Sequence, residues 1–150
     1  MNNTRRMILK GGLALLVLAS LPRTIMAAVW PKKIFSSTTA SEALKSLLGT
    51  DATTPSDRIN LKVPEIAENG AVVPVSIDTS LENVESISIV VKNNPRPMAA
   101  TFEIPPGTLP KIASRIKMGE TSDVMAVIKT SNGIYSATSE VKVTIGGCGG

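Results

Sequence analysis

Short runs of alternating apolar and polar residues, separated by turn residues, fill the chain from Ile59 to Ile145. Successive side chains of a β-strand point to opposite faces of its sheet, so a period of two is typical of half-buried strands. Parallel sheets need helical crossovers between strands, and no helical pattern separates these runs. The sequence therefore predicts an all-β fold, an antiparallel immunoglobulin-like β-sandwich of about seven strands. The predicted strands are 59–63, 73–77, 87–91, 101–104, 112–118, 124–128 and 134–145.

Turn residues between the runs indicate how the strands connect. Asn69-Gly70 predicts a turn, and Asn132-Gly133 predicts a hairpin of type I′, in which both central residues have φ > 0. Pro74 lies inside a run and cannot donate a ladder hydrogen bond, so it predicts an edge strand or a bulge.

One short helix is expected before the strands. Thr39 and Glu42 have the spacing of a capping box, in which Thr39 is the N-cap and Glu42 reaches back to the Thr39 amide. Gly49 is the expected stop, and the segment 50–57 is expected to be a loop. The apolar residues on one face of this helix are Ala43, Leu44, Leu47 and Leu48.

The first 28 residues resemble an export signal. Arg5 and Arg6, an apolar pair and Lys10 match the twin-arginine pattern, and the apolar run 11–21 is shorter than the roughly 20 residues that span a bilayer. Cleavage is expected after Ala27 or Ala28, and an uncleaved signal anchor is the alternative. We expect a signal peptide at 1–28, a helix and β-sandwich domain at 29–145 and a flexible arm at 146–150. The mature protein is expected in a bacterial periplasm, without a membrane segment.

Removal of this segment changes the charge of the protein. The chain has 16 basic and 12 acidic residues, and four of the basic residues lie within residues 1–28. The mature chain would then carry equal numbers of both, so a role in nucleic-acid binding loses its electrostatic support.

The C-terminal residues carry the only cysteine of the chain, Cys148, between Gly146-Gly147 and Gly149-Gly150. Glycine is conformationally permissive, so these residues predict a flexible arm that presents one thiol. The chain has no histidine, which excludes a Ser-His-Asp triad, a Cys-His dyad and His-ligated metal sites. We therefore expect no catalytic residues, no metal and no cofactor in this chain, and a carrier rather than an enzyme.

Three other interpretations of this terminus remain. The cysteine could be incidental in a frayed tail, because termini are commonly disordered. The protein could be a periplasmic structural or adhesion β-sandwich that dimerises through Cys148. A carrier that uses Gly149-Gly150 as a thiocarboxylate needs ATP and no cysteine, and the export signal argues against it.

The chain resembles the SoxY family, the sulfur-carrier subunits of the periplasmic thiosulfate-oxidising Sox system. The matching stretches are the twin-arginine leader at 4–10, 59–63, 66–70 with 73–75, 94–97, 141–145 and the terminus at 146–150. The resemblance implies that Cys148 is the covalent attachment site. It implies that a haem enzyme joins thiosulfate oxidatively to this sulfur and that a metallohydrolase then releases sulfate. It also implies a heterodimer with a SoxZ-like β-sandwich subunit, and a sulfane dehydrogenase is a further candidate partner.

Overall fold

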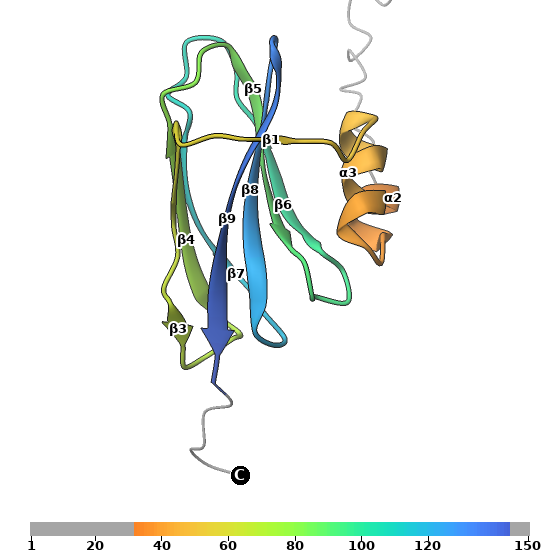
Figure 1. The fold of residues 1–150 in the computed structure, drawn as a ribbon, viewed down its shortest axis with the longest axis vertical. Helices are drawn as coiled ribbons and strands as arrows, with labels where there is room; N and C mark the ends of the chain where they lie inside the picture. The colour runs from red at the N-terminus through yellow and green to blue at the C-terminus, as the bar shows by residue number, and fades with distance from the viewer. Residues whose placement is uncertain (1–31, 145–150) are drawn as a thin grey trace, which may run out of the picture. The chain divides into compact units, whose positions relative to one another are not determined.

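A computed structural model describes residues 32–144 of the chain, and these residues form two β-sheets and two short helices (Figure 1). The helices are α2 (Lys32–Ser36) and α3 (Ala40–Leu48). The strands are β1 (Thr54–Pro55), β2 (Ile59–Lys62), β3 (Ile66–Ala67), β4 (Val73–Thr79), β5 (Val84–Val91), β6 (Met98–Glu103), β7 (Lys111–Ile116), β8 (Ser122–Thr130) and β9 (Gly133–Val143).

The strand order is that of an immunoglobulin-like sandwich. The larger sheet has the order β1-β9-β8-β5-β6, with β3 also pairing with β9, and the smaller sheet has the order β2-β4-β7. The seven longer strands pair antiparallel, and in chain order the first, second and fifth of them form the smaller sheet. This distribution requires the chain to cross between sheets as it does in Greek-key sandwiches. The predicted fold class and its seven strands are confirmed.

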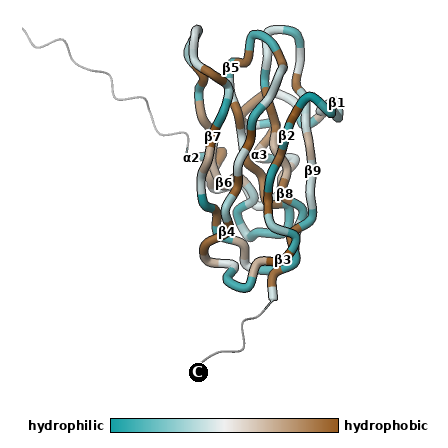
Figure 2. Tube along the Cα trace, turned by 90° about the vertical axis from the view of Figure 1, so that its left-hand side faces the viewer, coloured by the Kyte–Doolittle hydropathy of each residue, from teal (hydrophilic) through white to brown (hydrophobic). Residues whose placement is uncertain are grey.

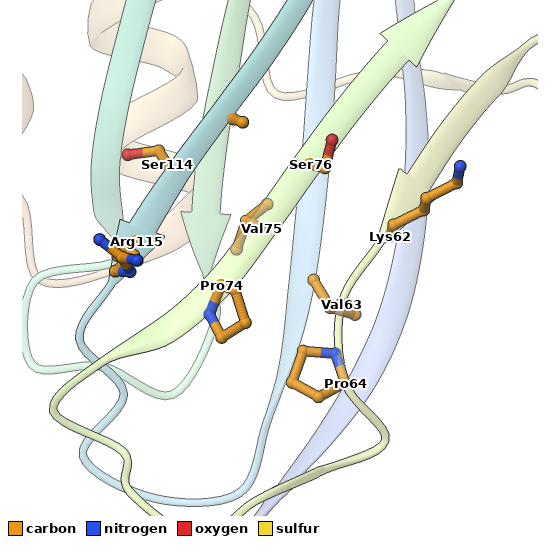
Figure 3. A pocket seen from close by; sticks show the side chains of 9 residues that line it. Lys62, Val63, Pro64, Pro74, Val75, Ser76, Ser114 and Arg115 are labelled. Carbon is orange, nitrogen blue, oxygen red and sulfur yellow. The ribbon is translucent and has the colours of Figure 1, made fainter.

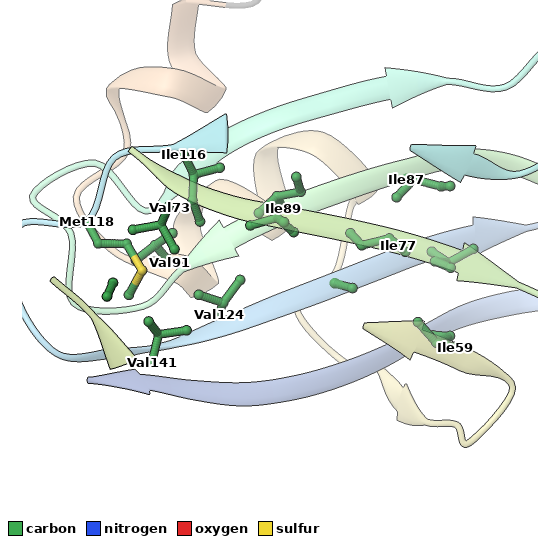
Figure 4. Packing of buried hydrophobic residues seen from close by; sticks show 14 of the residues in the cluster. Ile59, Val73, Ile77, Ile87, Ile89, Val91, Ile116, Met118, Val124 and Val141 are labelled. Atoms are coloured by element: carbon green, nitrogen blue, oxygen red, sulfur yellow. The ribbon is translucent and has the colours of Figure 1, made fainter. Parts of the chain in front are cut away.

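The core lies between the inner faces of the two sheets (Figure 4). Each inner face is made of the apolar residues that alternate along its strands, so the period of two in the sequence becomes a single buried layer. Ile77, Ile87, Ile89 and Ile128 are fully buried there. Burying one such side chain contributes about 1.5–3 kcal/mol, so this layer is the main source of stability.

Helix α3 begins and ends as the sequence predicts, with one difference in its N-terminal cap. The Thr39 hydroxyl accepts a hydrogen bond from the Glu42 amide at 3.2 Å, and Gly49 ends the helix with φ = 79°. The Glu42 carboxylate, however, accepts from the Thr38 amide at 3.3 Å rather than from the Thr39 amide. The reciprocal bond of the predicted capping box is therefore displaced by one residue.

The two helices cover the outer face of the larger sheet. Ile34 of α2 and Leu44 of α3 are buried in a second apolar cluster, and this cluster includes Val90, Met98 and Val127 of the sheet. Five residues are too few to show a helical period, so α2 could not be predicted from its residue pattern. The outer face of the smaller sheet carries no such cover within the described residues. None of the helices among the described residues is long and apolar enough to cross a membrane.

The prediction that Pro74 marks an edge strand or a bulge is wrong. Strand β4 is the middle strand of the smaller sheet. Its ladder with β2 covers only Ser76 to Thr79, while its ladder with β7 continues to Val73. Pro74 therefore lies where β4 has no partner on the β2 side, and no ladder bond is lost there.

The predicted hairpin at Asn132 forms, but its turn is not of type I′. Thr130 pairs with Gly133, so the two loop residues are Ser131 and Asn132, and neither of them has positive φ. The Thr130 hydroxyl accepts from the Asn132 amide at 3.1 Å and donates to the Gly133 carbonyl at 3.0 Å. These two bonds stabilise the turn in place of the backbone conformation that Asn-Gly usually supplies.

Strands β1 and β3, which the sequence did not predict, pair in parallel with β9. Each has two residues, and β1 lies in the segment expected to be a loop. The last long strand of the chain is thus paired on both of its edges.

Candidate functional site

The predicted site residues lie outside the described part of the chain. Cys148 and Gly146, Gly147, Gly149 and Gly150 follow the last described residue, Thr144, and Arg5 and Arg6 precede the first, Lys32. The structure instead describes the place from which the terminal segment starts, at the end of β9. We call Lys142, Val143 and Thr144 the arm base.

Strand β9 pairs with β8 over nine registered residue pairs, from Thr130↔Gly133 to Ser122↔Val141. Val141 is fully buried, so an apolar anchor fixes this strand immediately before the arm base. In Figure 1 the C-terminal strand runs to one end of the sandwich, where the β5–β6 and β7–β8 connections also lie. Backbone pairing and burial therefore hold the chain as far as Val141, where its pairing with β8 stops.

The arm base is held by hydrogen bonds on both sides beyond the end of that ladder. The Lys142 amide donates to the Glu65 carbonyl at 2.9 Å, and the Thr144 amide donates to the Ala67 carbonyl at 3.1 Å. Between them, the Val143 amide donates to the Thr121 hydroxyl at 3.0 Å. Each such bond contributes about 0.5–1.5 kcal/mol net, so three in succession hold the base against fraying.

Gly70 lies directly against the arm base and is required there for its small size. Its carbonyl accepts from the Met118 amide at 2.7 Å. A Cβ on Gly70 would overlap the Met118 carbonyl oxygen and lie 2.9 Å from Val143 Cγ1. The predicted turn is present, because the Asn69 backbone carbonyl accepts a hydrogen bond from the Val72 amide at 3.2 Å. The close approach of three segments at Gly70 is an additional constraint that no local pattern reveals.

The β5–β6 connection braces the same end of the sandwich. Asn94 Nδ2 donates to the Lys117 carbonyl at 2.7 Å, and Asn94 Oδ1 accepts from the Gly119 amide at 3.0 Å. Asn93 Nδ2 donates to the Thr121 carbonyl at 3.0 Å. Thr121 in turn holds Val143, so the stretch 94–97 noted in the sequence is coupled to the arm base through the β7–β8 connection.

The surface beside the arm base is mixed in character. Glu65, Ile66, Glu140 and Lys142 line a shallow hollow of about 220 Å³. Ile66 is 57% exposed and Val72 is 50% exposed, which is unusual for large aliphatic side chains. Among the described residues there is no group of three or more acidic, histidine or cysteine side chains that could hold a metal ion.

The two perturbed ionisable groups of the described chain lie away from the arm base and are structural. Hydrogen bonds from Ser41 and Lys45 lower the pKa of Asp51, and they tie the body of helix α3 to the loop after it. A hydrogen bond with Glu85 raises the pKa of Lys129 on β8.

Comparisons with known proteins give a family and a fold. Residues 44–148 match the family profile described as sulfur oxidation protein SoxY. The structure of the sulfur carrier protein SoxY from Chlorobium limicola f thiosulfatophilum is 38% identical in sequence and has a TM-score of 0.63. This similarity covers 69% of the present chain and 94% of that chain.

A superoxide reductase (neelaredoxin) from Ignicoccus hospitalis also aligns, with a TM-score of 0.52 and 17% identity, covering 61% of this chain and 81% of that one. At that identity the likeness concerns the fold alone. Comparison with curated protein sequences finds no match.

Proposed function

This chain belongs to the SoxY family of sulfur oxidation proteins, and we propose that it carries sulfur intermediates covalently on Cys148 and presents them to partner enzymes. The observation that carries the proposal is that the family match extends to residue 148, the position of the only cysteine. The thiol would lie four residues beyond the arm base, and four extended residues reach about 13–14 Å. That length allows a thiol to enter a cleft of another protein while the sandwich stays outside.

The proposed chemistry needs a partner at each step. In the first step the Cys148 thiol and thiosulfate are oxidised together, which forms a sulfur–sulfur bond and releases one proton and two electrons to a haem enzyme. In the second step a hydrolase adds water across the bond between the sulfane sulfur and the sulfonate, which releases sulfate and leaves a persulfide on Cys148. An unperturbed thiol has a pKa of about 8.5, so the partner would also have to favour the thiolate.

The remaining parts of the proposal concern assembly and location. We assign a twin-arginine leader with Arg5 and Arg6 to residues 1–28, and a periplasmic location to the mature protein. A SoxZ-like β-sandwich subunit is the proposed stable partner, and an interface of roughly 800 Å² per side is the usual size for such a complex. A haem enzyme, a sulfate-releasing hydrolase and a sulfane dehydrogenase are the proposed transient partners.

The test of the attachment site is Cys148→Ser in the reconstituted system. We expect the variant to melt at the wild-type temperature, to take up no mass from thiosulfate, and to abolish thiosulfate-dependent turnover. Intact-mass spectrometry and turnover are measured on the same samples. Retained turnover by this variant would contradict the carrier proposal.

A second test concerns the glycines rather than the sulfur. Proline fixes φ near −65° and restricts the residue before it, so Gly147→Pro should slow every partner enzyme and leave the melting temperature unchanged. Gly147→Ala is the milder control and should lie between wild type and the proline variant. Wild-type rates with Gly147→Pro would show that Gly146, Gly147, Gly149 and Gly150 have no role in presentation.

A further inference from the structure

The smaller sheet has a groove on its outer face, where β2 stops before its neighbours do (Figure 3). The last registered pair of β2 is Lys62↔Ser76, while β4 and β7 stay paired as far as Val73↔Ile116. The chain turns away at Val63 and Pro64 and leaves a hollow of about 670 Å³ beside the free part of β4. The groove is thus a consequence of unequal strand length.

The groove floor is apolar and poor in hydrogen-bond donors. Val63, Pro64, Pro74, Val75 and Ala113 contribute to its lining. Two of these residues are prolines, which have no backbone N–H and a fixed φ. A floor of this kind is formed before any ligand arrives, so binding there orders little chain.

The charges at the groove have one sign. Among the described residues, Lys62 and Arg115 are the only charged ones that line it, and Figure 3 shows them on opposite sides of Pro74. The ion pairs of the described residues are made by Lys45, Lys92 and Lys129, so Lys62 and Arg115 have no carboxylate partner there.

The rest of this outer face does not neutralise them. Asp78 is its one carboxylate within the β2, β4 and β7 ladders, and Asn60 Nδ2 donates to its two oxygens at 3.1 and 3.2 Å. Figure 2 shows the molecule from the side of this sheet. The hydropathy colours along these strands change between hydrophilic and hydrophobic in turn. Among the described residues no helix covers this face, in contrast to the larger sheet, where α2 and α3 pack.

We propose that this groove binds an extended acidic segment of a partner protein, with an aliphatic side chain on the proline floor and a carboxylate on each cation. The strand register gives the spacing between the two cations. Lys62 and Arg115 lie two strands apart and are offset by two residues, opposite Ser76 and Pro74. With strands about 4.8 Å apart and a rise of about 3.3 Å per residue, their Cα atoms are separated by about 12 Å.

Residues i and i+4 of an extended chain point to the same side and are separated by about 13 Å, which matches that spacing. The segment therefore has acids at i and i+4 and a small aliphatic residue at i+2. Arg115 can hold its carboxylate with two parallel hydrogen bonds, and Lys62 acts as a point charge. This docking uses neither Cys148 nor the arm base, so it stands independently of the carrier function.

The probe is the acetylated peptide Gly-Glu-Thr-Val-Thr-Glu-Gly, titrated into the full chain kept reduced. Isothermal titration calorimetry measures affinity, and ¹⁵N amide shifts locate the site. We expect shifts concentrated at Lys62, Ser76 and Arg115, and a loss of binding at 1 M salt, where the Debye length falls to about 3 Å.

Lys62→Ala and Arg115→Ala should each weaken binding about two- to fivefold, within the range of partly exposed ion pairs. Lys117→Ala removes a surface cation that does not line the groove and should leave affinity unchanged. A peptide with glutamine in place of glutamate should not bind, and one with the two glutamates adjacent should bind as weakly as the single variants.

Four results would overturn the proposal. The first is equal binding of the glutamine peptide, and the second is amide shifts that lie elsewhere. The third is reproduction of the same shifts by sodium sulfate at equal charge, which would make the groove a site for small oxyanions. The fourth is concentration-dependent shifts without peptide, which would assign the groove to a second copy of this chain.

Discussion

Replacement of Gly70 by alanine perturbs the arm base without touching any predicted functional residue. The new Cβ would overlap the Met118 carbonyl oxygen and lie 2.9 Å from Val143 Cγ1. One of these contacts is with backbone, which cannot rotate away, so the turn at Asn69 or the end of β9 must move. Gly70 does not have positive φ, so conformational strain of the alanine backbone does not contribute.

The expected loss of stability in Gly70→Ala is the balance of three contributions. Overpacking of this kind costs about 1–3 kcal/mol, and weakening of the Met118–Gly70 hydrogen bond adds about 1 kcal/mol. Alanine recovers about 0.4–1 kcal/mol by restricting the unfolded chain. The net destabilisation is roughly 2 kcal/mol, which for a domain of this size lowers Tm by roughly 8 °C.

Gly119→Ala is the matched control. A Cβ at Gly119 would meet only Asn94 Oδ1, at 3.9 Å, which is an ordinary contact. Thermal melts by circular dichroism should therefore separate the two variants, with Gly119→Ala within about 2 °C of wild type. Hydrogen exchange should accelerate at the amides of Val143 and Thr144 in Gly70→Ala alone. A Gly70→Ala protein that melts at or above the wild-type temperature would refute the packing argument.

Two further predictions concern single interactions. Thr121→Val removes the hydroxyl that accepts from the Val143 amide. It should lower the free energy of unfolding by about 1 kcal/mol and speed hydrogen exchange of that amide, and Thr121→Ser should restore both. Unchanged exchange in the valine variant would contradict the assignment. Hydrogen bonds from Ser41 and Lys45 lower the pKa of Asp51 below its ordinary 3.8, so the stabilisation is present above that value and is lost as the pH falls through the folded pKa. The difference in Tm between wild type and Asp51→Asn should therefore shrink between pH 6 and pH 2.5, and a difference that is constant across this range would argue against the interaction.

The elements that the sequence predicts well are those whose determinants are local. Helix α3 carries its N-cap at Thr39 and its stop at Gly49 within eleven residues, and the long strands carry their own period of two. Elements of two residues, such as β1 and β3, have no period, and only the position of β9 decides that they pair. The prediction of the turn type at Asn132 was wrong for a similar reason, because the Thr130 side chain stabilises another conformation.

The candidate site likewise has one part that the sequence predicts and another that it does not. The cysteine and its glycines are evident from the sequence, whereas the residues that hold the arm base are not. Thr121 lies 22 residues from Val143, and Gly70 reads as an ordinary turn glycine until Met118 and Val143 are seen against it. Pro74 indicated an edge strand, but β4 is the middle strand of its sheet. The short length of β2, which leaves Pro74 without a partner on that side, is a tertiary property.

The arm base matters to the proposed carrier because it sets how widely the thiol can range. From Thr144, Cys148 is four residues away and can reach about 13–14 Å, but from Val141 it is seven residues away and can reach about 23–25 Å. If the base frays, the accessible volume grows roughly fivefold, and the effective concentration of thiol at a docked partner's cleft falls by the same factor. Gly70→Ala and Thr121→Val should therefore slow turnover by up to about fivefold with docked partner enzymes, although both leave Cys148 and its glycines intact. Gly119→Ala should not slow it. Wild-type turnover in both variants, measured where exchange shows that the base has opened, would mean that the sandwich tethers the thiol without positioning it.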